Sequence, residues 1–326
     1  MTKRIEWIDA LKGFATLLVV LGHCIDGYKT AYLFPKYQDI FVSLYAFIYS
    51  FHMPLFFLVS GYLFHLAYNN VSQKKFFFKV LDIVLLYFIF STAQILVQIL
   101  MQGKINRTVD FVDILRLPVY ALPPYWYLYV LAALYVIFYF IVKKPHLIKL
   151  GLCFCVSCLS LFYAWSGAFQ LASILYYSVF FEIGGILSFS RLEFKRPLLC
   201  VLGLLALACI GFYINIRISK AIIAMTLSLA VVISFIKCKA LSDNKLFLLC
   251  GKYCLPIYLV HCYFTAGTRV VLKALCIKSV SPYLVSGMVL GVFAPIVIYE
   301  VCSRIHFLEF VFKPANVLQR ILARKL

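Results

Sequence analysis

The sequence predicts an all-α integral membrane protein, a bundle of about ten transmembrane helices with both termini in the cytoplasm. Three observations support this fold class. Hydrophobic residues fill 64% of the 326 positions and charged residues only 13%, against roughly 45–50% and 25% in an ordinary soluble domain. The apolar residues form long unbroken runs, and a membrane-spanning helix needs about 20 of them. The basic residues gather in short clusters between the runs, as they do in cytoplasmic loops.

This composition excludes several classes of protein. A soluble globule of this size would need a more polar exterior, and a β-barrel would show alternating rather than continuous apolar segments. No stretch outside the runs is long enough to fold alone, so we expect residues 1–326 to form a single membrane domain. The net charge of +19 is divided among short clusters and forms no basic stripe, so we expect no nucleic-acid partner.

The 12 cysteines give no sign of a disulfide framework or of a metal centre. Most of them lie inside apolar runs, where a free thiol behaves as a small hydrophobe. Cys153, Cys155 and Cys158 form a C-x-C-x-x-C cluster. No histidine and no second cysteine pair stands near them at ligand spacing, so we expect no metal.

Ten apolar runs are the expected helices. Lys12 interrupts the first run and no cleavage site follows it, so we interpret it as a retained helix rather than a signal peptide. Between the third and fourth runs, charges three residues apart from Arg107 to Arg116 predict a short amphipathic helix on the membrane surface. A solvated connector and a lid over an outward-facing site both fit this loop. The ten runs are Ala10–Ile25, Phe41–Leu66, Phe76–Leu100, Tyr125–Val142, Leu147–Trp165, Leu171–Phe189, Leu198–Ile214, Ala221–Ile236, Leu246–Ala266 and Tyr283–Cys302.

The charge distribution predicts the orientation. An even number of spans places both termini on one side. If that side is the cytoplasm, the inner segments and the adjoining starts of runs carry 19 of the 31 basic residues, Lys79 and Lys149 among them. The outer segments carry 10, and Lys12 and Lys252 are counted with neither side. This excess satisfies the positive-inside rule.

Ionisable groups inside apolar runs are costly, so they mark functional sites by default. Four of the six histidines lie in or at the edge of runs: His23, His52, His65 and His261. Glu182 also lies within a run, whereas His146 and His306 fall in inner loops and are expected to be ordinary. The alternative for the buried histidines is a hydrogen bond between helices, and for Glu182 it is pairing with a polar group on another helix.

Lys12 and His23 share one face of the first helix. Eleven residues at about 100° each make three turns plus about 20°, and at 1.5 Å per residue they span about 16.5 Å. The helix therefore offers a cation near the cytoplasm and an imidazole deeper in the membrane. An imidazole can accept and return a proton near neutral pH, which suits transfer from a donor that arrives from inside.

The second run contains two features that disturb a regular helix. Pro54 frees a backbone carbonyl and is expected to kink the helix. Ser60-Gly61 permits either close packing or a local break. Irregular backbone at membrane depth is tolerated where it lines protein or a wet cavity.

Several motifs in order along the chain resemble the acyltransferase-3 family of integral membrane O-acyltransferases, and within it the fucose 4-O-acetylase-like branch. The first two motifs together are specific, and the later ones are weaker alone. The motifs are W-I-D-A-L-K-G from Trp7 with His23 after it, F-H-M-P-L-F-F-L-V-S-G-Y-L from Phe51, Tyr125-Trp126-Tyr127-Leu128, F-F-E-I-G-G-I-L from Phe180, and G-K-Y-C-L-P-I-Y-L-V-H from Gly251.

The resemblance implies a multi-pass protein of the bacterial inner (plasma) membrane that takes an acyl group from cytoplasmic acyl-CoA. Acetyl-CoA is the default donor, and the acceptor is a sugar hydroxyl of a cell-surface or polyprenyl-linked glycan. The family's essential histidine corresponds to His23 and its basic partner to Lys12, where many members have arginine. Lys79-Val80-Leu81-Asp82 stands where many members carry Arg-x-x-Arg, and Cys254 replaces the usual serine.

These residues give a mechanistic hypothesis. Lys12, helped by Lys79 and Lys75, binds the phosphates of acyl-CoA, and His23 acts either as general base on the sugar hydroxyl or as an acyl carrier. The remaining site residues are expected to be Glu182, His52 and His261 in catalysis and Ser60, Tyr62 and Trp126 in substrate binding. Trp126 also fits an interfacial aromatic belt.

The main alternative function is a transporter or flippase of a polar or lipid-linked solute. A scaffold without activity is a third reading, which the cost of keeping buried ionisable groups disfavours. The acyl group, the sugar and the oligomeric state are left open by the sequence.

Overall fold

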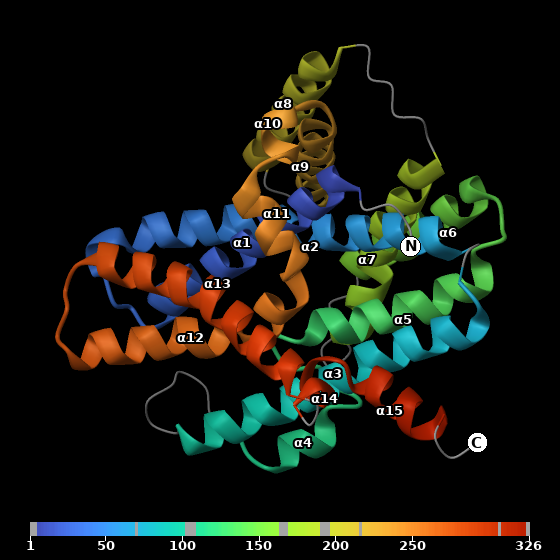
Figure 1. Ribbon diagram of the computed structural model, residues 1–326. Helices are drawn as coiled ribbons and strands as arrows, with labels where there is room; N and C mark the ends of the chain where they lie inside the picture. Colours follow the sequence, from blue (N-terminus) through green and yellow to red (C-terminus); the bar gives the residue numbers. More distant parts are fainter. Residues whose placement is uncertain are drawn as a thin grey trace. The chain divides into compact units, whose positions relative to one another are not determined.

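The computed structural model describes residues 5–68, 71–101, 109–162, 169–189, 196–214, 217–305 and 308–323, and every regular element in these ranges is helical (Figure 1). The elements are α1 (Glu6–Thr30), η1 (Pro35–Tyr37), α2 (Gln38–Tyr68), α3 (Gln73–Leu100), α4 (Val112–Arg116), α5 (Trp126–Ile141), α6 (His146–Phe162), α7 (Phe169–Phe189), α8 (Pro197–Ile214), α9 (Arg217–Lys237), α10 (Lys239–Ser242), α11 (Lys245–Lys252), α12 (Cys254–Ala274), α13 (Val280–Arg304), α14 (Glu309–Phe312) and α15 (Pro314–Ala323).

Seven helices in the described ranges are long and apolar enough to cross a membrane, and they lie in α1, α2, α3, α7, α9, α12 and α13. Three shorter apolar helices, α5, α6 and α8, also fall on predicted runs. Closing every backbone hydrogen bond within the segment is what makes the helix a stable spanning element. The all-α, multi-pass membrane class is therefore confirmed, while the count of about ten and the cytoplasmic termini stay predictions.

The run Leu246–Ala266 is not one helix, and this is a correction to the sequence analysis. It is divided at Tyr253 into α11 and α12. The ring of Pro256 would clash with the carbonyl four residues earlier, at Lys252, if the helix were continuous. The chain breaks there, and α12 then extends beyond the predicted end to Ala274.

In the second run, Ser60-Gly61 takes one of its two expected roles, and the kink at Pro54 stays a prediction. α2 continues as a helix through Pro54 and through Ser60-Gly61 up to Tyr68. Gly61 serves close packing instead of a break, because a methyl group there would overlap the carbonyl oxygen of Phe181. α2 and α7 therefore approach at backbone distance at this point, as small residues allow in membrane bundles.

The chain forms two compact units. The first consists of Met1–Val59 and Ser190–Val297, and the second of Ser60–Phe189 and Ile298–Leu326. In the first unit, α1 packs on α11 and α12, and α8 pairs with α9. In the second unit, α6 pairs with α7, and α3 packs on both α5 and α15.

Glycines fix the contact between α1 and α11 in the first unit. A methyl group at Gly13 would overlap the carbonyl oxygen of Phe247, and one at Gly251 would overlap that of Asp9. The W-I-D-A-L-K-G and G-K-Y-C-L-P motifs thus meet backbone to backbone. This contact anchors the helix that carries Lys12 and His23.

Candidate functional site: two buried polar clusters

Three of the four residues predicted for catalysis lie together in the first unit. We call them the histidine cluster: His23 on α1, His52 on α2 and His261 on α12. The His23 and His261 rings are 5.0 Å apart between centroids. Tyr49 on α2 lies beside both His23 and His52, with its ring centroid 6.3 Å from that of His23 and 4.6 Å from that of His52. His52 and His261 are buried, and His23 is half-buried.

Backbone contacts fix the tautomers of two of these histidines. The Nδ1–H of His52 donates to the carbonyl of Ile48 at 2.7 Å. The Nδ1–H of His261 donates to the carbonyls of Ile257 and Tyr258 at 2.9 and 2.8 Å. A carbonyl only accepts, so Nδ1 carries the proton in both neutral rings and Nε2 is left as the basic nitrogen. Both rings are therefore held in one orientation, with Nε2 as the hydrogen-bond acceptor.

Cys262 belongs to the same cluster, although the sequence analysis did not single it out. Its Sγ lies 3.2 Å from Nε2 of His261. Sγ of Cys262, a ring nitrogen of His261 and a ring nitrogen of His23 all lie within 4.8 Å of one another. Because Nε2 of His261 is the acceptor, the thiol donates to it.

Lys12 lies on the same α1 helix as His23 and is paired with Asp9. Its ammonium is 2.6 Å from the Asp9 carboxylate, and 24% of its side chain stays exposed. Thr16, one turn further along the same stripe, donates to the carbonyl of Lys12 at 2.7 Å. Since α1 is continuous from Glu6 to Thr30, the expected axial separation of about 16.5 Å between Lys12 and His23 holds.

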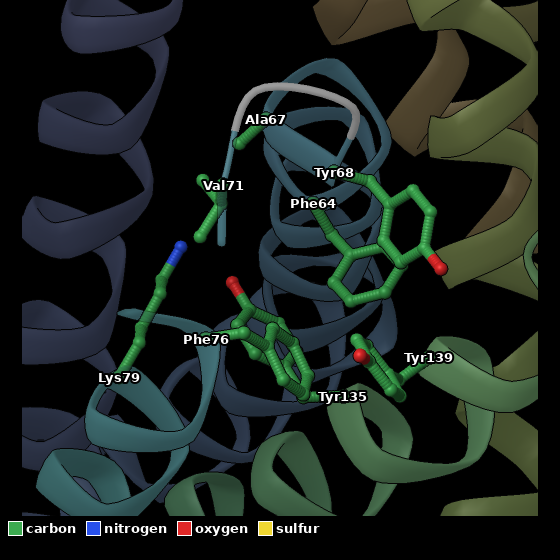
Figure 2. Close-up of a pocket in the computed structure, with 8 residues that line it drawn as sticks. All are labelled: Phe64, Ala67, Tyr68, Val71, Phe76, Lys79, Tyr135 and Tyr139. Carbon is green, nitrogen blue, oxygen red and sulfur yellow. The ribbon is translucent and has the colours of Figure 1, made fainter. Parts of the chain in front are cut away.

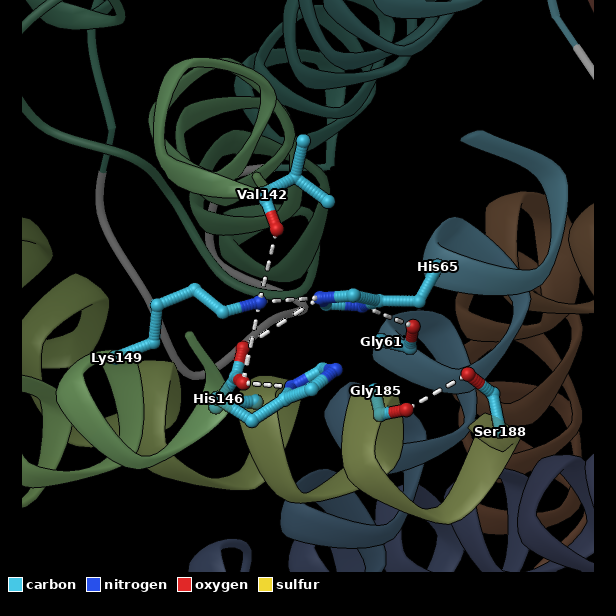
Figure 3. Close-up of polar contacts among 8 residues, drawn as sticks. Gly61, His65, Val142, His146, Lys149, Gly185 and Ser188 are labelled. Atoms are coloured by element: carbon cyan, nitrogen blue, oxygen red, sulfur yellow. Dashed lines mark hydrogen bonds and ion pairs between the residues drawn. The ribbon is translucent and has the colours of Figure 1, made fainter. Parts of the chain in front are cut away.

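Glu182, the fourth predicted catalytic residue, lies in the second unit at the centre of another group. This buried ion cluster consists of Glu182, Lys149, His146 and His65 from α7, α6 and α2 (Figure 3). Oε1 of Glu182 accepts from Nδ1 of His146 at 2.6 Å and pairs with the Lys149 ammonium at 3.2 Å. Glu182 is thus paired with another helix, as its structural alternative anticipated.

The lysine ammonium supplies the positive charge of the buried ion cluster. Its three N–H bonds face three acceptors: Nε2 of His65 at 3.3 Å, the carbonyl of Val142 at 3.3 Å and Oε1 of Glu182 at 3.2 Å. His65 can accept because its Nδ1–H donates to the carbonyl of Gly61 at 2.9 Å. Lys149 and Glu182 are 1% and 0% exposed, so the pair is compensated inside an apolar surrounding.

Both clusters contain groups of residues that could hold a metal ion by donor type. In the buried ion cluster, His65, His146 and Glu182 form such a set. The Lys149 ammonium already lies there as a cation and contacts His65 and Glu182 of this set. In the histidine cluster the set is His23, His261 and Cys262. Imidazole and thiolate suit zinc, so the expectation of no metal stays a prediction at that position.

The residues predicted to bind the donor are divided between the units. Lys12 belongs to the first unit, and Lys75 and Lys79 lie on α3 in the second. Lys79 lines a pocket whose walls are mainly aromatic, with its ammonium 5.1 Å from the ring centroid of Tyr135 (Figure 2). In its wall, Phe76 and Tyr139 stack on each other, with ring centroids 4.4 Å apart and ring planes at 17°. Lys75 is exposed at the start of α3.

The residues predicted to bind the acceptor also lie in the second unit. Ser60 shares a hydrogen bond of 2.8 Å with the hydroxyl of Tyr127. Trp126 begins α5, and its ring lies 5.5 Å from that of Tyr177 on α7. Tyr62 is half-buried on α2.

Three residues of the clusters escaped the sequence analysis because it treated them as loop cations or ordinary groups. His146 was expected in an inner loop, and Lys149 was counted with the cytoplasmic charges, but both lie on α6, three residues apart and therefore on one face. Cys262 was grouped with the other apolar thiols. A usable signal did exist, since Glu182 within an apolar run requires a cationic partner.

Comparisons with known proteins agree with this membrane architecture. Neither a search of curated proteins nor a search of solved structures finds a match. Residues 5–300 match the family model described as an acyltransferase domain, which is that of acyltransferase-3. This match covers nearly the whole chain, so the protein belongs to the acyltransferase-3 family and is a membrane acyltransferase.

Proposed function

We propose that this acyltransferase moves an acetyl group from cytoplasmic acetyl-CoA to a sugar hydroxyl of a cell-surface or polyprenyl-linked glycan, in the bacterial inner membrane. The observation that carries the proposal is the surrounding of His23. It is the half-buried member of a cluster in which the other two imidazoles are held by the backbone. A group reachable by substrate and surrounded by fixed polar partners is a suitable general base.

In the proposed reaction, His23 accepts the proton of the sugar hydroxyl, and the oxygen attacks the thioester carbonyl. The C–S bond breaks and the thiolate takes up the proton. His52 and His261 keep the neighbourhood of His23 polar, with backbone carbonyls fixing their orientation. Glu182 is assigned to the buried ion cluster, where its effect on catalysis would be indirect.

Phosphate recognition is assigned to Lys12 in the first unit and to Lys75 and Lys79 in the second. A lysine acts on a phosphate as a point charge. Ser60, Tyr62 and Trp126 are proposed for the acceptor.

The first test is transfer of radiolabel from acetyl-CoA into glycan by membranes that contain the wild type or His23→Ala. Loss of a general base lowers turnover by about 10²–10⁴-fold, so we expect label in the wild type and almost none in the variant at equal protein level. Lys36→Ala, on the exposed η1 turn, is the mock control. Equal incorporation by His23→Ala would remove His23 from the chemistry. Absence of label from every sample would contradict the proposed pairing of acetyl-CoA with a glycan acceptor.

A second test separates donor binding from catalysis. Lys12→Ala is expected to raise the KM for acetyl-CoA by about tenfold or more, the loss of one charged contact of about 1.4 kcal/mol or more, and to leave the acceptor dependence unchanged. Lys29→Ala is a matched control, because Lys29 also lies on α1 and pairs with an aspartate three residues earlier, at 3.0 Å. An unchanged donor KM in Lys12→Ala would contradict the assignment.

A further inference from the structure

Cys262 and His261 form a thiol–imidazole pair inside the candidate site. Among the cysteines that the structure describes, Cys262 is the one whose sulfur bonds a histidine nitrogen, at 3.2 Å. A nucleophile in hydrogen-bond contact with a base that is itself held by a third group is the signature of covalent catalysis. Here the third group is the pair of backbone carbonyls of Ile257 and Tyr258.

The orientation of His261 decides the direction of proton flow in this pair. Its Nδ1–H is committed to the backbone, so Nε2 is free to take the proton of the thiol. The thiolate, not the thiol, is the nucleophile. His261 is buried, whereas Cys262 is half-buried, so the base is more enclosed than the residue that carries the sulfur.

The position of His23 completes the arrangement. A ring nitrogen of His23 lies within 4.8 Å of Sγ of Cys262. The carbonyl carbon of an acyl group on Cys262 would be bonded directly to this sulfur. An acceptor hydroxyl that hydrogen-bonds His23 at about 2.6–3.2 Å would then lie near that carbon. For attack, its oxygen must approach the carbon to roughly 3–3.5 Å.

We infer that Cys262 is a catalytic residue that carries the acyl group as a thioester between donor and acceptor. In the first half-reaction, His261 takes the thiol proton and Sγ attacks the carbonyl of acyl-CoA. The bond to the CoA sulfur breaks, and the released thiolate receives the proton. In the second, His23 takes the proton of the acceptor hydroxyl, the oxygen attacks the Cys262 thioester, and the proton returns to Sγ.

This sequence exchanges one thioester for another and then forms an ester, so it needs no further reactant. It rests on the proposed function for the identity of donor and acceptor. It replaces two alternatives, the direct attack of the acceptor oxygen on acetyl-CoA and the acyl-histidine at His23, with a carrier on α12.

The test is retention of radiolabel by purified protein in detergent with radiolabelled acetyl-CoA and no acceptor. We expect label on the wild type that neutral hydroxylamine releases, and mass mapping to Cys262. Cys262→Ala should lose at least about tenfold of the label, whereas His23→Ala should keep or accumulate it because only the second half-reaction is blocked. Cys24→Ala, a buried cysteine beside His23 on α1, is the matched control and should label normally.

Cys262→Ser is a second variant for the case in which Cys262→Ala loses its label only because it does not fold. Serine keeps the size of the side chain, and an ester on its oxygen resists neutral hydroxylamine, so slow labelling that becomes resistant would support the carrier role. Label that maps elsewhere, or label lost in His23→Ala but kept in Cys262→Ala, would overturn it. Glycan transfer without any labelled protein would also overturn it while leaving the proposed function intact. Labelled Cys262 without transfer to glycan would support the carrier and contradict the proposed acceptor. Absence of both labelled protein and labelled glycan would contradict both proposals.

Discussion

At the scale of single residues, the buried ion cluster shows how an apolar bundle accommodates full charges. Removing one partner of a buried pair leaves the other uncompensated, at a cost of about 3–5 kcal/mol. Lys149→Met should therefore lower the stability of the protein strongly, since both charged side chains are essentially inaccessible. Glu182→Gln should do the same, because it removes the negative charge that faces the Lys149 ammonium and that His146 also contacts.

The double variant Lys149→Met/Glu182→Gln separates pairing from packing. If the pair is the origin of the cost, the double change should destabilise by clearly less than the sum of the two single changes. Thermal unfolding in one detergent, followed by loss of monodisperse protein, measures all four species. Strict additivity would contradict the pairing argument.

The residue scale is also where the sequence was least informative. The position of His23 on the same helix face as Lys12 followed from helical periodicity, because both lie on one helix. The partners of Glu182 could not follow in this way, since they come from α2 and α6, 117 and 33 residues before it for His65 and Lys149. The Cys262–His261 bond depends on the rotamers of two adjacent side chains, which a pattern of residue types does not contain.

At the scale of elements, glycines set the closest helix contacts. Gly61→Ala is expected to destabilise the second unit by about 1–3 kcal/mol through overpacking, because the added methyl group would overlap the Phe181 carbonyl. Gly151 on α6 is the matched control, since a methyl group there meets nothing within 4 Å. Gly151→Ala should be neutral or stabilise by up to about 1 kcal/mol. Thermal unfolding of the two variants compares them directly, and an equal effect of both would contradict the contact.

The helices themselves were predictable because the length of an apolar run and the need to close its backbone hydrogen bonds are both properties of one continuous segment. The error came at α11 and α12, where hydropathy is continuous but the backbone is not. Pro256 divides the run, and this proline has no effect on hydropathy. In α2, by contrast, the helix is continuous through Pro54.

At the scale of the whole molecule, the orientation is the prediction with the widest consequences, because it decides which side supplies each substrate. The basic residues predict cytoplasmic termini, which places the loop between α12 and α13 outside and the segment between α9 and α10 inside. Two native cysteines report on these positions. Cys276 and Cys238 are both exposed, and each lies just beyond the end of a helix.

A membrane-impermeant maleimide applied to intact spheroplasts should therefore label Cys276 and spare Cys238, and permeabilised cells should label both. Cys276→Ser should abolish the signal from intact cells, and Cys238→Ser should leave it unchanged. The exposed cysteines within α6 and α8 face apolar surroundings and should react poorly with a charged reagent, since the reactive thiolate is disfavoured there. Labelling of Cys238 alone in intact cells would invert the orientation. It would also move the Lys12 end of α1 to the outside, away from cytoplasmic acyl-CoA, so the proposed direction of transfer would fall with it.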